Sequence, residues 1–260
     1  MDVSRAMRTA TNIAPRLGDS ADWWRIPALT AMLSLAAVFF SLTASGESVQ
    51  GNADVTPRKL VIFGASYAGS WGTPPLPGYV VTNRGVGGDT TADMRARFQR
   101  DVVAANPDAV LIWGHVNNIT KSGVAGATAE QAKAVTNAAR ADYVAMLQQA
   151  RAAGIEVILA TEVPRSEPAG FVNELRGWVS RLLGKESYSS RVNVYVRELN
   201  TFVRQLAARE KLLLLDFEKV FAPEGGARKT EFAKEDQSHI TEAGYRALTA
   251  YSVKALAAAR

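Results

Sequence analysis

From Lys59 onward, short and uniformly apolar segments alternate with segments whose apolar residues recur at helical spacing. The apolar segments are the expected strands: Leu60–Phe63, Tyr79–Thr82, Ala109–Trp113, Glu156–Ala160 and Leu212–Phe217. Strands that are apolar on both faces and separated by helices are typical of a parallel sheet with helices on both sides. The pattern therefore predicts an α/β protein, a three-layer α/β/α sandwich around a parallel sheet of about five strands.

The segments between these strands predict the helices. They are Thr90–Ala105, Glu130–Ala153, Val192–Arg209 and Thr241–Ala259. Gly154 is an expected C-terminal cap and Thr241 an expected N-terminal cap. Residues 165–191 form a long insertion after the fourth strand. We interpret this insertion as a packed helix, with a lid over the edge of the sheet as the alternative.

The composition excludes several kinds of site. The 260 residues include no cysteine, which excludes disulfides, thiolate metal sites, iron–sulfur clusters and a cysteine nucleophile. Only two histidines occur, His115 and His239, so a multi-histidine metal site is excluded as well. The net charge of +5 is scattered without a basic run, which favours a solvated surface over nucleic-acid binding. The Gly85-x-Gly87 pair is followed by Thr90 where a dinucleotide fingerprint needs glycine.

The N-terminal region differs from the rest of the chain. Residues 26–46 carry no charge, follow four arginines and begin just after two tryptophans. As a helix this stretch would extend about 30 Å, enough for a hydrocarbon core. We expect residues 1–45 to be an uncleaved signal anchor with its inner-membrane span at 26–44; a cleaved signal peptide and a cytoplasmic amphipathic leader are the alternatives. Either a signal anchor or a cleaved signal peptide would place the following domain in the periplasm or outside the cell. The polar composition of residues 46–57, with Gly, Ser and Pro, predicts a linker, and residues 58–260 are the expected folded domain.

Polar segments follow the predicted strands at their carboxyl ends. They are residues 64–67 (GASY), 83–90 (NRGVGGDT), 114–118 (GHVNN) and, before the last helix, 236–239 (DQSH). In open parallel sheets ligands bind at the carboxyl ends of the strands. The four segments therefore predict one site at one edge of the sheet.

The residue types in these segments fit nucleophilic catalysis. Ser66 lies where a strand ends, between small residues, and a serine nucleophile needs an exposed position and a nearby base. His239 is a candidate base, and Asp236, three residues earlier, can orient its imidazole. A developing oxyanion needs N–H donors, and two are available here. One is the backbone N–H of Gly88, with Gly87 as the alternative, and the other is the side-chain amide of Asn117.

The same segments resemble the SGNH (GDSL-type) hydrolases over about residues 58–255. This resemblance implies a flavodoxin-like sandwich and ester hydrolysis that needs no metal or cofactor. Matched position by position, it implies that Ser66 is the nucleophile, Asp236 and His239 complete the triad, and Gly88 and Asn117 form the oxyanion hole. Two blocks of this chain depart from the family pattern. Where the family has Gly-Asp-Ser, this chain has Ala65 in place of the aspartate. In the family's third block, His115 stands in place of a glycine and Asn118 in place of an aspartate, which leaves the subfamily and the substrate open.

The sequence leaves two further residues and three functions open. Tyr67 and His115 are candidate substrate contacts. The alternative for Tyr67 is plain packing, and the alternative for His115 is a hydrogen-bonded histidine of the loop. We expect a serine ester hydrolase that acts on a small acyl ester, a lipid or an acylated glycan. The alternatives are a membrane-tethered O-acyltransferase or deacetylase acting on envelope or exported polysaccharide, and a catalytically silent envelope-binding domain.

Overall fold

The computed structural model describes residues 56–168, 182, 184, 186–222 and 226–259. The chain divides into two compact units, Met1–Gln50 and Gly51–Arg260, and the described residues all belong to the second. The expected membrane segment at 26–44 lies outside the described residues, as does most of the expected linker. Within the described part of the chain, no helix is both long and apolar enough to cross a bilayer.

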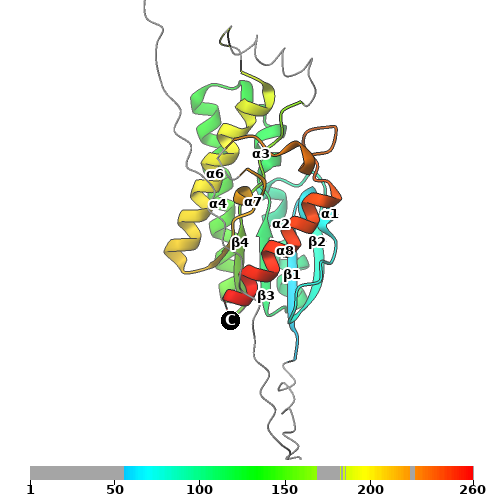
Figure 1. Ribbon diagram of the computed structural model, residues 1–260. Helices are drawn as coiled ribbons and strands as arrows, with labels where there is room; N and C mark the ends of the chain where they lie inside the picture. Colours follow the sequence, from blue (N-terminus) through cyan, green and yellow to red (C-terminus); the bar gives the residue numbers. More distant parts are fainter. Residues whose placement is uncertain (1–55, 169–181, 183, 185, 223–225, 260) are drawn as a thin grey trace, which may run out of the picture. The chain divides into compact units, whose positions relative to one another are not determined.

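The second unit is built on one sheet of five parallel strands, in the order β2-β1-β3-β4-β5 (Figure 1). The strands are β1 (Arg58–Gly64), β2 (Tyr79–Gly85), β3 (Ala109–Trp113), β4 (Glu156–Ala160) and β5 (Leu213–Leu215). The α/β class and the parallel sheet predicted from the apolar segments are therefore confirmed.

Helices connect the strands. The α-helices of the described chain are α1 (Ser66–Trp71), α2 (Thr91–Asp101), α3 (Val116–Lys121), α4 (Ala129–Ala152), α6 (Tyr188–Glu210), α7 (Phe217–Phe221) and α8 (Glu242–Ala258). Short 3₁₀ turns occur at Val103–Ala105, Val124–Gly126 and Thr230–Phe232. Local signals fix several helix starts, since Thr90 accepts the N–H of Asp93 and Thr241 that of Gly244.

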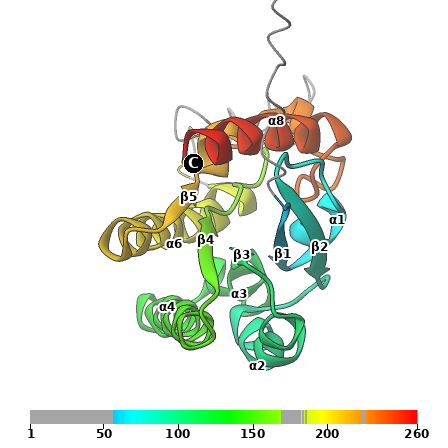
Figure 2. The same cartoon turned by 90° about the horizontal axis from the view of Figure 1, so that it is seen from below.

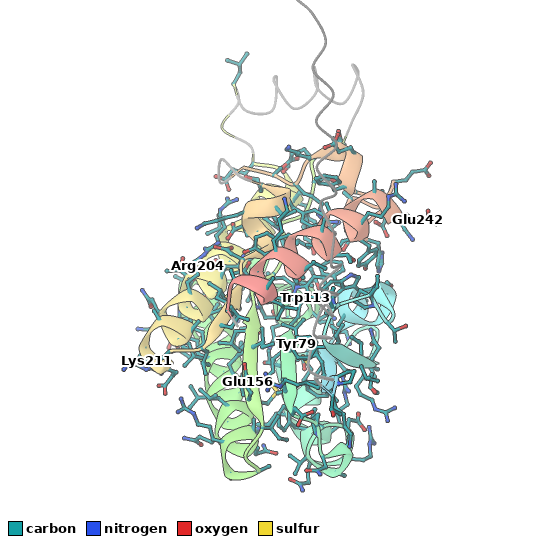
Figure 3. All side chains as sticks on the ribbon, turned by 60° about the horizontal axis from the view of Figure 1, so that its bottom comes forward. Tyr79, Trp113, Glu156, Arg204, Lys211 and Glu242 are labelled. Carbon is teal, nitrogen blue, oxygen red and sulfur yellow. The ribbon has the colours of Figure 1, made fainter. Side chains whose placement is uncertain are left out.

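Figure 2 shows α8 on one side of the sheet and α2 and α4 on the other. The side chains of the sheet supply an apolar core on each face. Leu60 and Ile62 of β1 belong to the core shared with α1 and α8, and Val61 and Phe63 to the core shared with α2 and α4. Because successive side chains of a strand point to opposite faces, one apolar strand serves both layers. Trp113, at the end of β3, is fully buried near the centre of the domain (Figure 3).

The predicted fifth strand, Leu212–Phe217, is too long. β5 ends at Leu215, and Phe217 begins α7. Between them the carboxylate of Asp216 binds the guanidinium of Arg204 at 2.7 Å and accepts the hydroxyl of Thr161 at 3.0 Å. These contacts come from residues distant in sequence, so the apolar run LLLLDF could not indicate where the strand stops.

The short helices α1 and α3 were not predicted, because six residues are too few to show a helical period. The insertion at 165–191 contains the start of α6 at Tyr188. Its residues 169–181 lie outside the described part of the chain, so the lid remains a prediction.

Two glycines at strand ends let α1 lie directly against the sheet. A Cβ added to Gly64 would lie 1.9 Å from the carbonyl oxygen of Trp113, and one added to Gly85 would lie 2.1 Å from the amide nitrogen of Gly69 in α1. Both neighbours are backbone atoms of fixed elements. Only glycine fits at these positions, and the helix that begins at Ser66 depends on them.

We predict that Gly85→Ala destabilises the domain by about 1–3 kcal/mol or more, because the added methyl group overlaps the backbone of α1. Gly126→Ala is the matched control, since a Cβ there meets no described atom within 4 Å. Urea unfolding followed by circular dichroism measures both. Equal unfolding free energies for the two variants would contradict the close packing of α1 on β2.

Candidate active site

The four polar segments meet at the carboxyl ends of the strands, where they surround a cleft of about 530 Å³. This is the end of the sheet at the top of Figure 1. The cleft is lined by Ser66, Tyr67, Gly87, Gly88, Val116, Asn117, Thr120, Arg165, Tyr188, Ser238 and His239. Ser66, Gly88, Asn117 and His239, which lie far apart in the sequence, thus border one cavity.

Ser66 is the first residue of α1 and is partly exposed to the cleft. The other end of this short helix is held by Asn83, whose amide donates to the carbonyls of Ala68 at 2.7 Å and Gly72 at 2.5 Å. Helix carbonyls without a partner need such capping. The asparagine that opens the NRGVGGDT segment therefore fixes the helix that carries Ser66.

Gly88 lies in the turn after β2 with a φ of +84°, a conformation that favours glycine. The turn is held by the buried guanidinium of Arg97, which bonds the carboxylate of Asp89 at 2.5 Å. The same guanidinium donates to the carbonyls of Gly64 and Arg84. Arg97 thus joins the ends of β1 and β2 to the glycine turn.

Asn117 is the second residue of α3, and its Nδ2 donates to the carbonyl of Asp89 at 2.9 Å. An amide nitrogen carries two hydrogens, so one donor remains for the cleft. The buried carboxylate of Glu162 accepts the N–H of His115 at 2.9 Å at the start of this helix. Burial raises the pKa of Glu162, although bonds from backbone N–H groups offset part of that shift.

The Asp236 carboxylate and the Nδ1 atom of His239 form a short hydrogen bond. Because Nδ1–H of His239 donates to Asp236, the Nε2 atom of the ring carries the free lone pair. The second carboxylate oxygen accepts the N–H groups of Ser238 at 2.9 Å and His239 at 2.8 Å. Burial raises the pKa of Asp236, but these hydrogen bonds, that of the imidazole foremost, outweigh it and lower the pKa to about 2.

The loop that carries His239 is tied to the nucleophile helix through the buried Arg228. Its guanidinium donates to the carbonyl of His239 at 3.1 Å, to that of Pro164 at 2.7 Å and to the hydroxyl of Tyr67 at 3.1 Å. The Tyr67 hydroxyl in turn donates to the carbonyl of Ser238 at 2.8 Å. Tyr67 therefore lines the cleft and also orients the loop that carries His239.

His115 does not line the cleft. It is fully buried, and its Nδ1 lies 3.2 Å from the hydroxyl of Tyr143. Burial lowers the pKa of His115 to about 3, so the ring is neutral near pH 7. The sequence left two interpretations of His115 open, and its buried position favours the hydrogen-bonded loop histidine over the substrate contact. Asn118 is buried too and bonds both the N–H and the hydroxyl of Thr91.

Three residues of the cleft lie outside the four polar segments: Thr120, Arg165 and Tyr188. Arg165 and Tyr188 belong to the insertion at 165–191, but neither was singled out from the sequence. Thr120 lies in α3 and Tyr188 starts α6, so neither is in a segment directly after a strand. Arg165 follows β4, and the charged residues Glu162 and Arg165 after that buried strand were the available signal. They lacked a recognisable motif.

Comparison with known proteins agrees with this architecture. A sequence model of the GDSL-like Lipase/Acylhydrolase family matches residues 41–247. A search of curated proteins finds no match.

Similar solved structures include a GDSL-like lipase from Bacteroides thetaiotaomicron VPI-5482, at 20% identity and a TM-score of 0.58, covering 78% of this chain and 90% of that one. A lipase/acylhydrolase from Enterococcus faecalis has 22% identity and a TM-score of 0.55, with 78% and 96% covered. A catalytic mutant of an acetylxylan esterase from Geobacillus stearothermophilus has 20% identity and a TM-score of 0.57, with 77% and 94% covered.

At these identities the structures establish a shared fold, while the family match spans most of the sequence. The chain therefore belongs to the GDSL-like lipase/acylhydrolase family, the SGNH-type esterases and acylhydrolases.

Proposed function

We propose that the protein is a serine ester hydrolase that works through an acyl-enzyme on Ser66. The observation that carries this proposal is the common cleft of Ser66, Gly88, Asn117 and His239, with Asp236 bound to the far side of the imidazole. This arrangement offers a hydroxyl, a base with a free Nε2 and donors for an oxyanion within one cavity.

In the proposed acylation step, Oγ of Ser66 attacks the ester carbonyl while Nε2 of His239 accepts the hydroxyl proton. The tetrahedral oxyanion is held by the N–H groups of Gly88 and Ser66 and by the free Nδ2 hydrogen of Asn117. His239 then gives its proton to the alcohol oxygen as the carbon–oxygen bond breaks. Asp236 stabilises the imidazolium that forms between the two proton transfers.

In deacylation, water takes the place of the alcohol. His239 removes a proton from the water as it attacks the acyl carbonyl, and returns that proton to Oγ of Ser66. The products are the carboxylic acid and the free serine. Besides the ester and the water, each proposed step uses groups of this chain.

A second function keeps the same acyl-enzyme but transfers the acyl group to a sugar hydroxyl. The uncharged stretch at residues 26–44 favours it, since we propose that this stretch anchors the protein in the inner membrane with the domain outside the cytoplasm. A polysaccharide, as an ester substrate or as the acceptor through a free hydroxyl, is also in keeping with the acetylxylan esterase among the similar structures. Transfer to added polysaccharide that outpaces hydrolysis would favour this second function.

We predict that Ser66→Ala lowers kcat for a p-nitrophenyl ester by a factor approaching about 10⁶, because the nucleophile is lost. The wild type forms a single fluorophosphonate adduct in an intact-mass measurement, and Ser66→Ala and His239→Ala do not. Ser70→Ala, in the same helix, is the control for loss of a hydroxyl. Polymer binding without turnover of any ester would instead support a silent binding domain.

Asn117→Ala is expected to lower kcat by about 10²–10³ with little change in KM, because its amide acts in the transition state. Steady-state kinetics with the same ester measures both constants. Asn137→Ala, an exposed position of α4, is the control. A variant of Asn117 that loses only substrate affinity would argue against an oxyanion donor.

The Asp236–His239 pair makes the protein's stability depend on pH. The pKa of Asp236 is lowered to about 2 in the folded protein, against about 3.9 for a free aspartate. Ionised Asp236 thus stabilises the fold above about pH 4, and this contribution is lost as the pH falls toward about 2. The wild type should therefore lose most of its advantage over Asp236→Asn in urea unfolding between pH 7 and pH 2.5.

Glu235→Gln, the adjacent exposed position, controls for removal of a negative charge from this loop. An advantage of the wild type over Asp236→Asn that persists unchanged at pH 2.5 would contradict the assigned pair.

A further inference from the structure

The cleft contains one guanidinium that the proposed chemistry does not use. Arg165 lines the cleft, and among the described residues no carboxylate forms an ion pair with it. Nη2 of Arg165 donates to the backbone carbonyl oxygen of Asp236, with 3.2 Å between the two atoms. The buried Nε of Arg165 has no hydrogen-bond partner in the described structure. An arginine has five N–H donors, four of them on the two Nη atoms, so Nη donors of Arg165 remain for a ligand.

The position of Arg165 is fixed by its surroundings. Its backbone N–H donates to Oδ1 of Asn193 at 2.7 Å, and its carbonyl accepts Nδ2 of the same side chain at 2.9 Å. The N–H of Arg228 donates to that carbonyl as well. The guanidinium carbon lies 5.6 Å from the centre of the Tyr188 ring, in cation–π distance. The backbone of Arg165 is thus held by Asn193 and Arg228, and its guanidinium by the Asp236 carbonyl and the Tyr188 ring. This restraint reduces the entropy that the side chain loses when it binds a ligand.

Among the described residues that line the cleft, Arg165 carries the one lasting charge, because the others are neutral apart from the catalytic imidazole. The carboxylate of Asp89 is paired with Arg97. The carboxylate of Asp236 keeps its charge, but it is not part of the lining, and it accepts the imidazole N–H and two backbone N–H groups, whereas Arg165 bonds only the backbone carbonyl of that residue. Beside the lining, Nζ of Lys121 would lie 3.3 Å from a Cβ added to Gly88, so a second cation stands at the glycine turn. Within the described part of the chain, an anion in the cleft therefore meets a guanidinium and no carboxylate of the lining.

We propose that Arg165 is the recognition group for an anionic substrate, an ester that carries a carboxylate or a phosphate beside the bond to be cleaved. This inference rests on the proposed esterase function and adds the substrate class. A guanidinium binds both anions through parallel N–H···O bonds, and Lys121 at the glycine turn adds attraction for either. A neutral ester gains neither interaction, so the cleft should select for charge.

The test compares three acetyl esters that differ in one substituent: 4-acetoxybenzoate, 4-acetoxyphenyl phosphate and the neutral 4-acetoxybenzamide. For the full-length protein, kcat/KM is measured for each, and the ratio of each anionic ester to the neutral one is taken. Intrinsic reactivity cancels when these ratios are compared between variants. Any disturbance of the Asp236 loop cancels too, because all three esters use the same catalytic groups.

Arg165→Gln should lower at least one anionic-to-neutral ratio by about tenfold or more, the lower end expected for bonds to a charged group in a partly exposed site. The ester whose ratio falls further identifies carboxylate or phosphate as the recognised anion. Arg209→Gln is the matched control, because this exposed arginine lies at the end of α6 just before β5, away from the cleft. Its ratios should equal those of the wild type.

Equal ratios in wild type and Arg165→Gln for both anions would overturn the proposal, even with a fully active esterase. Failure of the wild type to cleave any of the three esters would count against the esterase function instead. Anion recognition is then tested by calorimetric binding of 4-acetamidobenzoate, with 4-acetamidobenzamide as the neutral reference. Loss of the anion's advantage in Arg165→Gln supports the proposal, and no advantage in the wild type overturns it.

Discussion

The contact on which the rest of the site depends is the backbone-to-backbone approach at the ends of β1 and β2. Gly64 lies against the carbonyl of Trp113 and Gly85 against the backbone of α1, at separations that leave no room for a side chain. Because α1 can lie this close, Ser66 begins a helix at the edge of the sheet instead of standing away from it on a loop. The glycine turn after β2 and the start of α3 then border the same cleft, since they follow strands that flank β1.

Two buried arginines hold the loops around this edge. Arg97 joins the ends of β1 and β2 to Asp89, and Arg228 joins the carbonyls of Pro164 and His239 to the hydroxyl of Tyr67. A buried charge is tolerated only when its donors are bonded, and each of these guanidiniums is bonded to several segments at once. Removing either would break several of the hydrogen bonds that join these segments. Arg165, by contrast, has donors to spare and lies in the open cleft, which is the physical basis for assigning it a ligand.

The sequence predicted the regular part of the fold well, because that part follows from local patterns. The run AVLIW is apolar throughout and EVILA is apolar after Glu156, and β3 and β4 have the predicted bounds. Thr241 caps α8 through a side chain to a backbone group three residues away, also a local interaction. Where the outcome depended on distant partners the prediction was wrong or absent. β5 ends just before Asp216, which forms an ion pair with Arg204. The helices α1 and α3 are too short to show a helical period of apolar residues in the sequence.

The sequence by itself determined the parallel α/β sheet and the edge at which the polar segments gather, since strand direction and apolar pattern suffice for both. The match of its motifs to a family of hydrolases likewise needed no coordinates. Only the tertiary structure decided which of those polar residues border the cleft. It buried His115 against Tyr143 and brought Arg165 and Tyr188 into the lining. The reason is physical: burial and hydrogen-bond partners are set by residues far away in the chain, and a linear pattern does not record them.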